Sequence, residues 1–180
     1  MLHVKDLLEV GPGAAEPFRK VWRGVAGTVA VVATEHEGER RAMLATAVTS
    51  LSMDPPSLLV CVNRSAAAHQ ALIGRGAFTL GILGADEVGL GAHLAATRGE
   101  ARFTRGEWSA ISAPDPVLDG LPALEGGQAL LVCRLDRHMD YGSHCILIGR
   151  VDRASRAENC DPLLYCDGMF GGFAAAPKPG

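Results

Sequence analysis

The sequence has no apolar run of the roughly 18 residues that a membrane-spanning helix needs. Its first 13 residues contain Lys5, Asp6 and Glu9, and these charges interrupt the apolar segment that a signal peptide requires. No five or six like charges follow one another, and the formal net charge is only −3, so no basic surface for nucleic acid is predicted. These absences predict a cytoplasmic protein whose partners include neither a membrane nor a nucleic acid.

Cysteine is present but follows no disulfide or metal-binding pattern. The number of cysteines, five, is odd, and no two of them have Cys-x-x-Cys spacing. Three lie in strongly apolar stretches, where a thiol packs as a small apolar side chain. We therefore expect free, buried thiols in a reducing compartment, which again indicates the cytoplasm. The cysteines are Cys61, Cys133, Cys145, Cys160 and Cys166.

Several nucleotide-binding and catalytic motifs are also missing. Glycine is abundant, with 22 residues, yet no Gly-x-Gly-x-x-Gly follows a predicted strand and no P-loop pattern occurs. A Rossmann domain is therefore not expected. No Gly-x-Ser-x-Gly elbow is present, and no His, Cys and Asp residues have the sequence spacing of a metal site. We expect neither a serine nucleophile nor a bound metal.

The chain is long enough for one domain with a proper core. Its 180 residues are 48% hydrophobic and 21% charged, and a chain of this length buries about two-thirds of its unfolded surface. Residues 1–13 are predicted to be an N-terminal extension, and residues 171–180, rich in Gly, Ala and Pro, a disordered tail. The domain itself is expected to span residues 14–170.

Three segments have the pattern of helices. The first covers residues 14–25, in which apolar residues recur at helical spacing. Ser65 is expected to cap a second helix over residues 66–73. The third covers residues 86–97, again with an apolar side.

Extended segments outnumber these helices. They are predicted over residues 29–33, 41–50, 57–62, 77–83, 128–139, 145–151 and 163–166. Asp54-Pro55-Pro56 must interrupt any regular element, because the residue before a proline is restricted to extended conformations. Strands joined as hairpins, rather than alternating with helices, predict a mainly β domain: an antiparallel barrel with a few flanking helices.

The most informative stretch is residues 42–63, AMLATAVTSLSMDPPSLLVCVN. Small residues such as Ala45, Thr46 and Ala47 let the backbone approach a flat ring closely, while Thr49 and Ser50 offer hydroxyls and backbone donors to a phosphate. The same residues also suit an ordinary strand that alternates small and β-branched side chains. The pattern by itself favours the ordinary strand.

Three segments together resemble the flavin reductase-like family, whose fold is the FMN-binding split barrel, a Greek-key antiparallel β-barrel. They are residues 42–63, Tyr141-Gly142-Ser143-His144 with the strand that follows, and Asp161-Pro162-Leu163-Leu164-Tyr165. They keep the family's order and spacing over residues 18–170. Within the family the chain is most similar to the small reductase components of two-component flavin-dependent monooxygenases. The resemblance implies an enzyme that uses NADH or NADPH to reduce FMN or FAD.

The resemblance also implies which residues contact the flavin. Most belong to the informative stretch; others lie on the first strand, on the strand after the prolines, on a helix near the phosphate or adenylate end, and at an aromatic position able to cover the ring. The implied residues are Thr28, Val29, Ala30, Val31, Met43, Leu44, Ala45, Thr46, Ala47, Val48, Thr49, Ser50, Cys61, Val62, Asn63, His93, Leu94 and Tyr165. Taken alone, His93 fits a surface helix, Asn63 a turn and Tyr165 ordinary core packing.

Gly142, Ser143 and His144 stand where the family has Gly-Asp-His or Gly-Thr-His, a triplet whose histidine is implicated in nicotinamide binding. A histidine can hydrogen-bond the nicotinamide carboxamide or meet the charge of the pyrophosphate. Without the family, an exposed hairpin histidine is the ordinary interpretation. The chain departs from the family at Ser143, which replaces the more frequent aspartate, at Leu44, where many members have threonine, and at Ala42, where many have glycine.

The implied reaction is hydride transfer between nicotinamide C4 and flavin N5, which needs close stacking but no nucleophile or metal, so no catalytic side chain is assigned. The resemblance further implies a homodimer and a separate monooxygenase that receives reduced flavin. Two alternatives stay open. One is a split-barrel protein that binds flavin or haem as an electron carrier or sensor without NAD(P)H activity. The other, an oxidase of an aminated vitamin B6 phosphate, requires basic residues converging on a phosphate, and no such cluster is apparent in the sequence.

Overall fold

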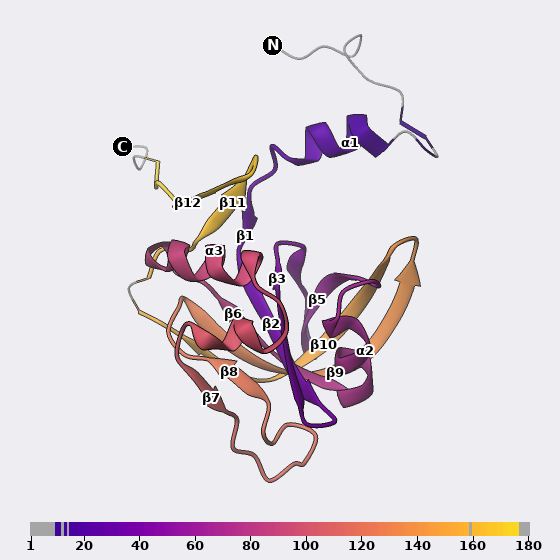
Figure 1. Ribbon diagram of the computed structural model, residues 1–180, viewed down its shortest axis with the longest axis vertical. Helices are drawn as coiled ribbons and strands as arrows, with labels where there is room; N and C mark the ends of the chain where they lie inside the picture. The colour runs from indigo at the N-terminus through magenta and orange to yellow at the C-terminus, as the bar shows by residue number, and fades with distance from the viewer. Residues whose placement is uncertain (1–9, 12, 14, 159, 177–180) are drawn as a thin grey trace.

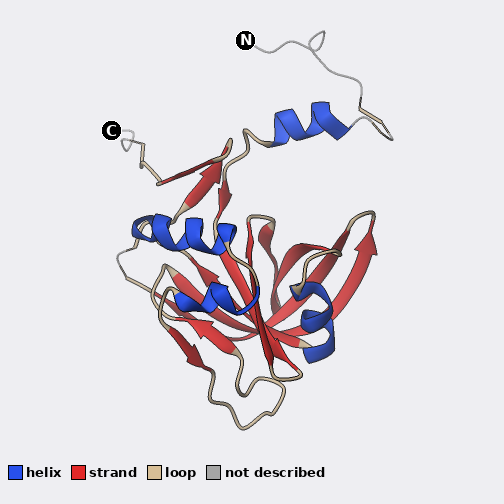
Figure 2. Cartoon of the chain, in the orientation of Figure 1, coloured by secondary structure: helices blue, strands red, loops and turns tan. Residues whose placement is uncertain are grey.

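The computed structural model describes residues 10–11, 13, 15–158 and 160–176. The expectations for an extension over residues 1–13, for a helix start at Ala14 and for a disordered tail over residues 171–180 therefore lie partly outside the described residues. Seven strands form one antiparallel sheet, with helices packed on it (Figures 1 and 2). These strands are β2 (Ala30–His36), β3 (Glu39–Ala45), β4 (Val48–Met53), β5 (Pro56–Asn63), β6 (Ala77–Ile82), β9 (Ala129–Tyr141) and β10 (His144–Arg156).

The remaining elements are short. In the described residues they comprise three α-helices, two 3₁₀ helices and two small sheets. They are α1 (Ala15–Trp22), β1 (Gly27–Thr28), α2 (Ala68–Arg75), η2 (Ala85–Glu87), α3 (Val88–Ala96), η3 (Gly99–Thr104), β7 (Trp108–Ala110), β8 (Pro122–Leu124), β11 (Leu164–Cys166) and β12 (Met169–Gly171). β1, β11 and β12 pair with one another, as do β7 and β8.

The main sheet has the strand order β3-β2-β6-β9-β10-β5-β4, with antiparallel neighbours throughout. β3 and β4 are its two edges, yet only Thr46 and Ala47 separate them in the chain, so the sheet curls until its edges meet. The backbone N–H of Cys61 donates to the Ala47 carbonyl at 3.0 Å and continues the β4–β5 pairing, whereas no ladder joins β3 to β4 in the described residues. The predicted antiparallel split barrel is confirmed.

Strand β2 is buried on both faces, which explains its continuous apolar run. Ala30 and Val32 belong to the core inside the barrel, together with Leu72 of α2. The alternate residues Val31 and Ala33 belong to a second core beneath α3 and η3. α2 and α3 thus lie on opposite faces of the same strand (Figure 1).

Strands β9 and β10, each 13 residues long, form the longest hairpin of the sheet. Their turn is shorter than predicted: Gly142 and Ser143 alone connect Tyr141 to its partner His144, and Gly142 takes the left-handed φ of 56° that such a tight turn favours. The hairpin therefore carries the predicted nicotinamide residues at its tip.

Local expectations were wrong in three places. The predicted strand over residues 41–50 is divided between β3 and β4 by the bend at Thr46 and Ala47. Ser65 does not cap α2, because the Asn63 Oδ1 accepts both its backbone N–H and its hydroxyl, at 2.9 and 2.8 Å, and α2 begins only at Ala68. Strands β7, β8 and β12 were not predicted, since strands of three residues carry no periodic pattern.

Candidate functional site

A cavity of about 400 Å³, called here the arginine cavity, opens beside the edge strand β3. Strand β3, the turn into α2, and the end of α3 with η3 enclose it. Its lining residues are Arg41, Ala42, Met43, Leu44, Asn63, Ser65, Ala66, Ala67, Ala68, Leu94, Ala95, Arg98, Gly99 and Arg102. Buried apolar residues such as Leu94 and Ala42 form part of its wall, and polar groups supply the rest. Its size falls in the range of small-molecule sites.

Three arginines, Arg41, Arg98 and Arg102, line this cavity. Arg41 forms an ion pair with Glu39, so its charge is balanced, and the positive charge comes from Arg98 and Arg102. Arg102 is tied to the protein by its Nε, which donates to the Thr97 carbonyl at 2.9 Å, and by an Nη1 bond to the Ala42 carbonyl. Burial, and then the charge of Arg98, lower the pKa of the Arg102 guanidinium. The two cations thus repel each other, and an anion between them would relieve that repulsion.

The start of α2 adds uncharged donors to the same cavity. The Asn63 side chain is held by its bonds to Ser65, and Ala66 donates its N–H to the Asn63 carbonyl at 2.9 Å. Ala67 is the N-cap, and no side chain caps the helix. The N–H of His69 already donates to the Ala66 carbonyl at 2.9 Å. The first N–H groups of a helix attract anions where they remain unpaired. A phosphate is therefore the group that both halves of this cavity suit.

The tip of the β9–β10 hairpin adjoins this turn. His144 pairs with Asn63 across β10 and β5, and the Arg64 N–H donates to the Ser143 carbonyl at 3.0 Å. The guanidinium of Arg64 also reaches the Gly142 carbonyl, at 3.4 Å. The Ser143 Oγ lies 2.9 Å from the Nδ1 of His144, and all three tip residues are exposed. The residues predicted for nicotinamide binding therefore lie next to Asn63, which was predicted for flavin.

A second cavity, the barrel cavity, has a volume of about 470 Å³ and opens between β4 and the inner face of the sheet. Its wall is largely apolar and includes no lysine or arginine. Its lining residues are Thr28, Val48, Thr49, Ser50, Ser52, Met53, Pro56, Ser57, Leu58, Leu80, Ile82, Gln128, Leu131 and Val151. The structure thus divides the predicted flavin residues: Met43, Leu44, Asn63 and Leu94 line the arginine cavity, and Thr28 with residues 48–50 line the barrel cavity.

Several other predicted contacts lie in neither cavity. The side chains of four of them, Val29, Ala30, Val31 and Val62, are at most 1% exposed and lie in the core, and Ala45, at 7%, is nearly as enclosed. Thr46 and Ala47 are exposed on the link between β3 and β4, and Cys61 is half-buried nearby.

His93 and Tyr165 also lie away from the two cavities. The Nε2 of His93 lies 2.9 Å from the Ala101 carbonyl, a contact that ties α3 to η3. Tyr165 packs edge-on against Phe170, with ring centroids 5.4 Å apart, in the small sheet beside β1. His93 therefore has an ordinary role within a surface helix, whereas Tyr165 is 39% exposed and does not belong to the core.

The sequence analysis missed the basic cluster. Arg41 lies far along the chain from Arg98 and Arg102. The approach of η3 to β3 brings the three side chains to one cavity. The segment from Ser65 to Ala68 was not predicted as part of a cavity wall either, although small side chains before a helix are a recognisable signal. The cluster is a convergence of basic residues of the kind that the vitamin B6 phosphate alternative requires and that the sequence did not reveal.

Comparison with known proteins identifies the family. The model of the flavin reductase like domain matches residues 22–174. The chain belongs to the flavin reductase-like family. The expected family, enzyme class and cofactors, a flavin and a nicotinamide nucleotide, are thereby confirmed.

Two named relatives align with more than 90% of the chain. The reductase component of an FADH(2)-dependent resorcinol hydroxylase from Rhizobium sp. (strain MTP-10005) is 36% identical over 168 residues, which are 92% of this chain and 89% of that protein. An FMN reductase (NADH), RutF, from Methylorubrum populi is 32% identical over 170 residues, 94% of this chain and 81% of that one.

Solved structures agree with the fold. BorF, the flavin reductase component of a bacterial two-component tryptophan halogenase, superposes with a TM-score of 0.78 at 32% identity, over 90% of this chain and 99% of that chain. The NADH:FAD oxidoreductase SgcE6 of Streptomyces globisporus superposes with a TM-score of 0.83 at 29% identity, over 97% of this chain and 96% of that one. SgcE6 has also been solved in complex with NAD and FAD fragments.

Within the described part of the chain, no helix has the length and hydropathy needed to cross a bilayer.

Proposed function

We propose that this chain is an NAD(P)H:flavin oxidoreductase whose FMN or FAD binds in the arginine cavity. The observation that carries the proposal is the meeting of three segments: the cationic cavity beside β3, the uncapped start of α2, and the hairpin tip with His144. The cavity and the start of α2 suit a phosphate. The hairpin tip lies beside them, where a nicotinamide nucleotide can approach the flavin.

The residues of the chain bind and orient the two cofactors. Arg98, Arg102 and the N–H groups at the start of α2 hold the flavin phosphate, and Met43 and Leu44 contact the apolar part of the molecule. His144 holds the nicotinamide nucleotide at the hairpin tip. The bound flavin supplies the chemistry, by accepting a hydride from the nicotinamide, so the protein needs to align two rings and exclude water rather than supply an acid or a base.

Reduced flavin then leaves for a separate monooxygenase. This part of the proposal rests on relatives named as reductase components of a hydroxylase and of a halogenase. We place the enzyme in the cytoplasm, because the five cysteines are free thiols and such thiols persist in a reducing compartment.

Steady-state oxidation of NADH and NADPH, each with FMN and with FAD, tests the proposed activity. Loss of nicotinamide absorbance should depend on added or retained flavin in at least one of the four combinations. Protein that retains flavin but oxidises neither nucleotide would select the alternative of an electron carrier or sensor, for which the same phosphate site would serve.

Reversing the charge of Arg98 tests the phosphate contact. Arg98→Glu should weaken flavin binding by about 3- to 10-fold, a modest factor because the side chain is exposed and its charge is screened. Isothermal titration with FMN measures the effect, and the difference from wild type should shrink at high salt. Arg98→Lys retains the charge and should bind nearly as tightly; equal losses in both variants would remove charge as the cause.

We also propose that the enzyme is a homodimer. Helix α1 extends away from the body of the protein (Figure 1), and none of its residues is buried. Phe18 and Trp22 stack at 5.6 Å between ring centroids, yet their side chains are 54% and 60% exposed, and Val21 beside them is 67% exposed. An amphipathic helix that leaves its apolar face in water is typical of a segment that packs on a second subunit.

The double variant Phe18→Asp/Trp22→Asp should therefore raise the dimer dissociation constant by about 10- to 100-fold, since it removes two large apolar contacts from each subunit. Light scattering at micromolar concentration measures the change. Arg19→Gln/Lys20→Gln, on the same helix, changes the formal charge of the chain by the same amount without loss of aromatic surface and serves as the control. Wild-type protein that is already monomeric would contradict the dimer.

A further inference from the structure

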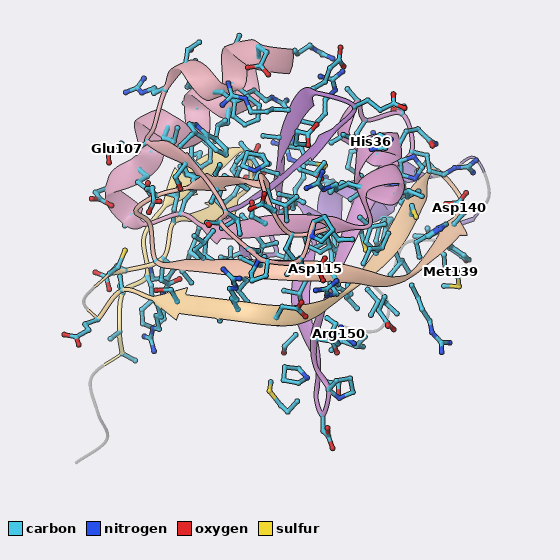
Figure 3. The ribbon with its side chains drawn as sticks, turned by 90° about the horizontal axis from the view of Figure 1, so that it is seen from below. His36, Glu107, Asp115, Met139, Asp140 and Arg150 are labelled. Carbon is cyan, nitrogen blue, oxygen red and sulfur yellow. The ribbon has the colours of Figure 1, made fainter. Side chains whose placement is uncertain are left out.

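His69, Asp140 and Cys145 form a cluster of potential metal ligands outside the arginine cavity. One ligand atom from each residue lies within 4.8 Å of those of the other two. His69 belongs to α2, whereas Asp140 and Cys145 flank the tip of the β9–β10 hairpin; Figure 3 shows Asp140 with Met139 at that end of the molecule. His69 and Asp140 are 71 positions apart in the sequence, so no local motif predicts the cluster. The packing of α2 beside the hairpin brings the three residues together.

The buried imidazole of His69 has no hydrogen-bond partner for its Nε2 atom. The residue is 4% exposed, and its Nε2 is the single buried side-chain nitrogen or oxygen left unpaired in the described chain. A buried polar atom without a partner lowers the stability of the folded state. The unpaired nitrogen therefore indicates that a group other than the protein binds it. The other ring nitrogen, Nδ1, lies 3.3 Å from the amide nitrogen Nε2 of Gln70, a position that a half-turn of the amide gives to its oxygen.

Gln70 can fix the tautomer that a metal requires. With its amide oxygen turned toward the ring, Gln70 accepts a hydrogen bond from an Nδ1–H of His69 and leaves the Nε2 lone pair free. Histidines that bind metals generally donate their second ring N–H to such an acceptor, which orients the ring.

The two hairpin residues complement this nitrogen. Cys145 is fully buried, and its sulfur lies within 4.8 Å of a carboxylate oxygen of Asp140. Asp140 is about half exposed and forms an ion pair with Arg64, whose Nε lies 3.3 Å from the Asp140 Oδ2. A carboxylate has two oxygens, so Asp140 can bind a metal and keep Arg64 on the other side.

We propose that His69, Asp140 and Cys145 bind a thiophilic divalent cation, Zn²⁺. One sulfur, one nitrogen and one carboxylate oxygen are a ligand set that zinc accepts readily, with a fourth position left for water. Zinc bonds of about 2.0–2.3 Å require the ligand atoms to approach one another by about 1 Å, and rotation of the exposed Asp140 side chain provides most of this. On binding, the Cys145 thiol releases its proton to solvent and the thiolate forms the metal–sulfur bond.

The site is tested with Co²⁺ and Zn²⁺ added to the purified full-length protein after chelator treatment. Co²⁺ should give a thiolate-to-metal charge-transfer absorption with an end point of one ion per chain, and Zn²⁺ should displace it. A Zn²⁺ concentration about 100 times the dissociation constant should raise the melting temperature by roughly 5–10 °C, because the metal ties α2 to the hairpin only in the folded state.

Variants assign the ligands. Cys145→Ser should abolish the charge-transfer absorption, and Asp140→Asn should weaken Zn²⁺ binding by about 100-fold or more, since loss of an outer partner alone costs 10- to 100-fold. Asp140 is exposed, so Asp140→Asn reports on the ligand even where substitution of the buried Cys145 disturbs folding. His138→Gln, which removes an exposed histidine of β9, and Cys166→Ser are the matched controls and should bind as wild type does.

Absence of stoichiometric Co²⁺ binding would overturn the proposal. A charge-transfer absorption that survives Cys145→Ser would also overturn it, as would an Asp140→Asn variant whose Zn²⁺ affinity is unchanged. Loss of metal binding in His138→Gln or Cys166→Ser would overturn it too. None of these outcomes depends on whether the protein reduces flavin.

Discussion

Replacing Ala67 with tryptophan should abolish flavin binding and, with it, flavin-dependent oxidation of NAD(P)H. Ala67 lines the arginine cavity at the N-cap of α2, and its backbone has right-handed helical angles, φ −58° and ψ −24°, which any L-residue adopts. The position is exposed, so the larger side chain does not disturb the core. An indole there occupies the space beside the helix N-terminus that we assign to the flavin phosphate. Titration with FMN and FAD, followed by the oxidation assay, measures the loss.

Ala92→Trp is the matched control for this variant. Ala92 is an exposed residue of α3 that does not line the cavity. Its replacement by tryptophan adds the same indole to the surface. It should bind flavin as wild type does. If Ala67→Trp retained both flavin binding and activity, the flavin site would lie elsewhere, and the barrel cavity would become the leading candidate.

Replacing His144 with alanine should raise the KM for NAD(P)H by roughly 3- to 100-fold while it leaves flavin affinity nearly unchanged. The lower part of this range corresponds to a lost hydrogen bond with a neutral carboxamide, and the upper part to a lost bond with a charged pyrophosphate. His144 is exposed at the hairpin tip and pairs with Asn63, so it adjoins the arginine cavity without lining it. Steady-state kinetics at saturating flavin, with a separate flavin titration, distinguish the two effects.

Two further variants sharpen this test. His144→Asn retains a donor and an acceptor and should recover part of the nucleotide affinity. His138→Ala removes an exposed histidine from the same hairpin and should leave the KM unchanged. A His144→Ala variant that lost flavin affinity as strongly as nucleotide affinity would assign His144 to the flavin site or to the fold.

The fold was predictable because local signals agreed with one another. The continuous apolar run of β2 reflects a strand buried on both faces. β5 is also a continuous apolar run, and its alternate residues Leu58, Val60 and Val62 are buried inside the barrel. Prolines 55 and 56 lie where β4 ends and β5 begins. The break at Thr46 and Ala47 was not predictable, since it arises where the curled sheet brings its two edges together.

The site was predictable only in part, for a physical reason. A family resemblance indicates which segment lies near a cofactor, but alternate residues of a strand point to opposite faces, and a segment assignment does not distinguish them. Ala30 and Val31 were therefore included although they are sealed in the core, whereas Met43 and Leu44 do line a cavity. The cluster of Arg98 and Arg102 with Arg41 depends on a long-range contact that no local pattern encodes.

The position of the flavin phosphate in a crystal structure of the FMN complex tests the central claim most directly. The account predicts phosphate density in the arginine cavity, within hydrogen-bonding distance of Arg98 or Arg102 and of the backbone N–H groups at the start of α2. Flavin bound instead in the barrel cavity, against Thr49 and Ser50, with no ligand beside Arg102, would contradict it.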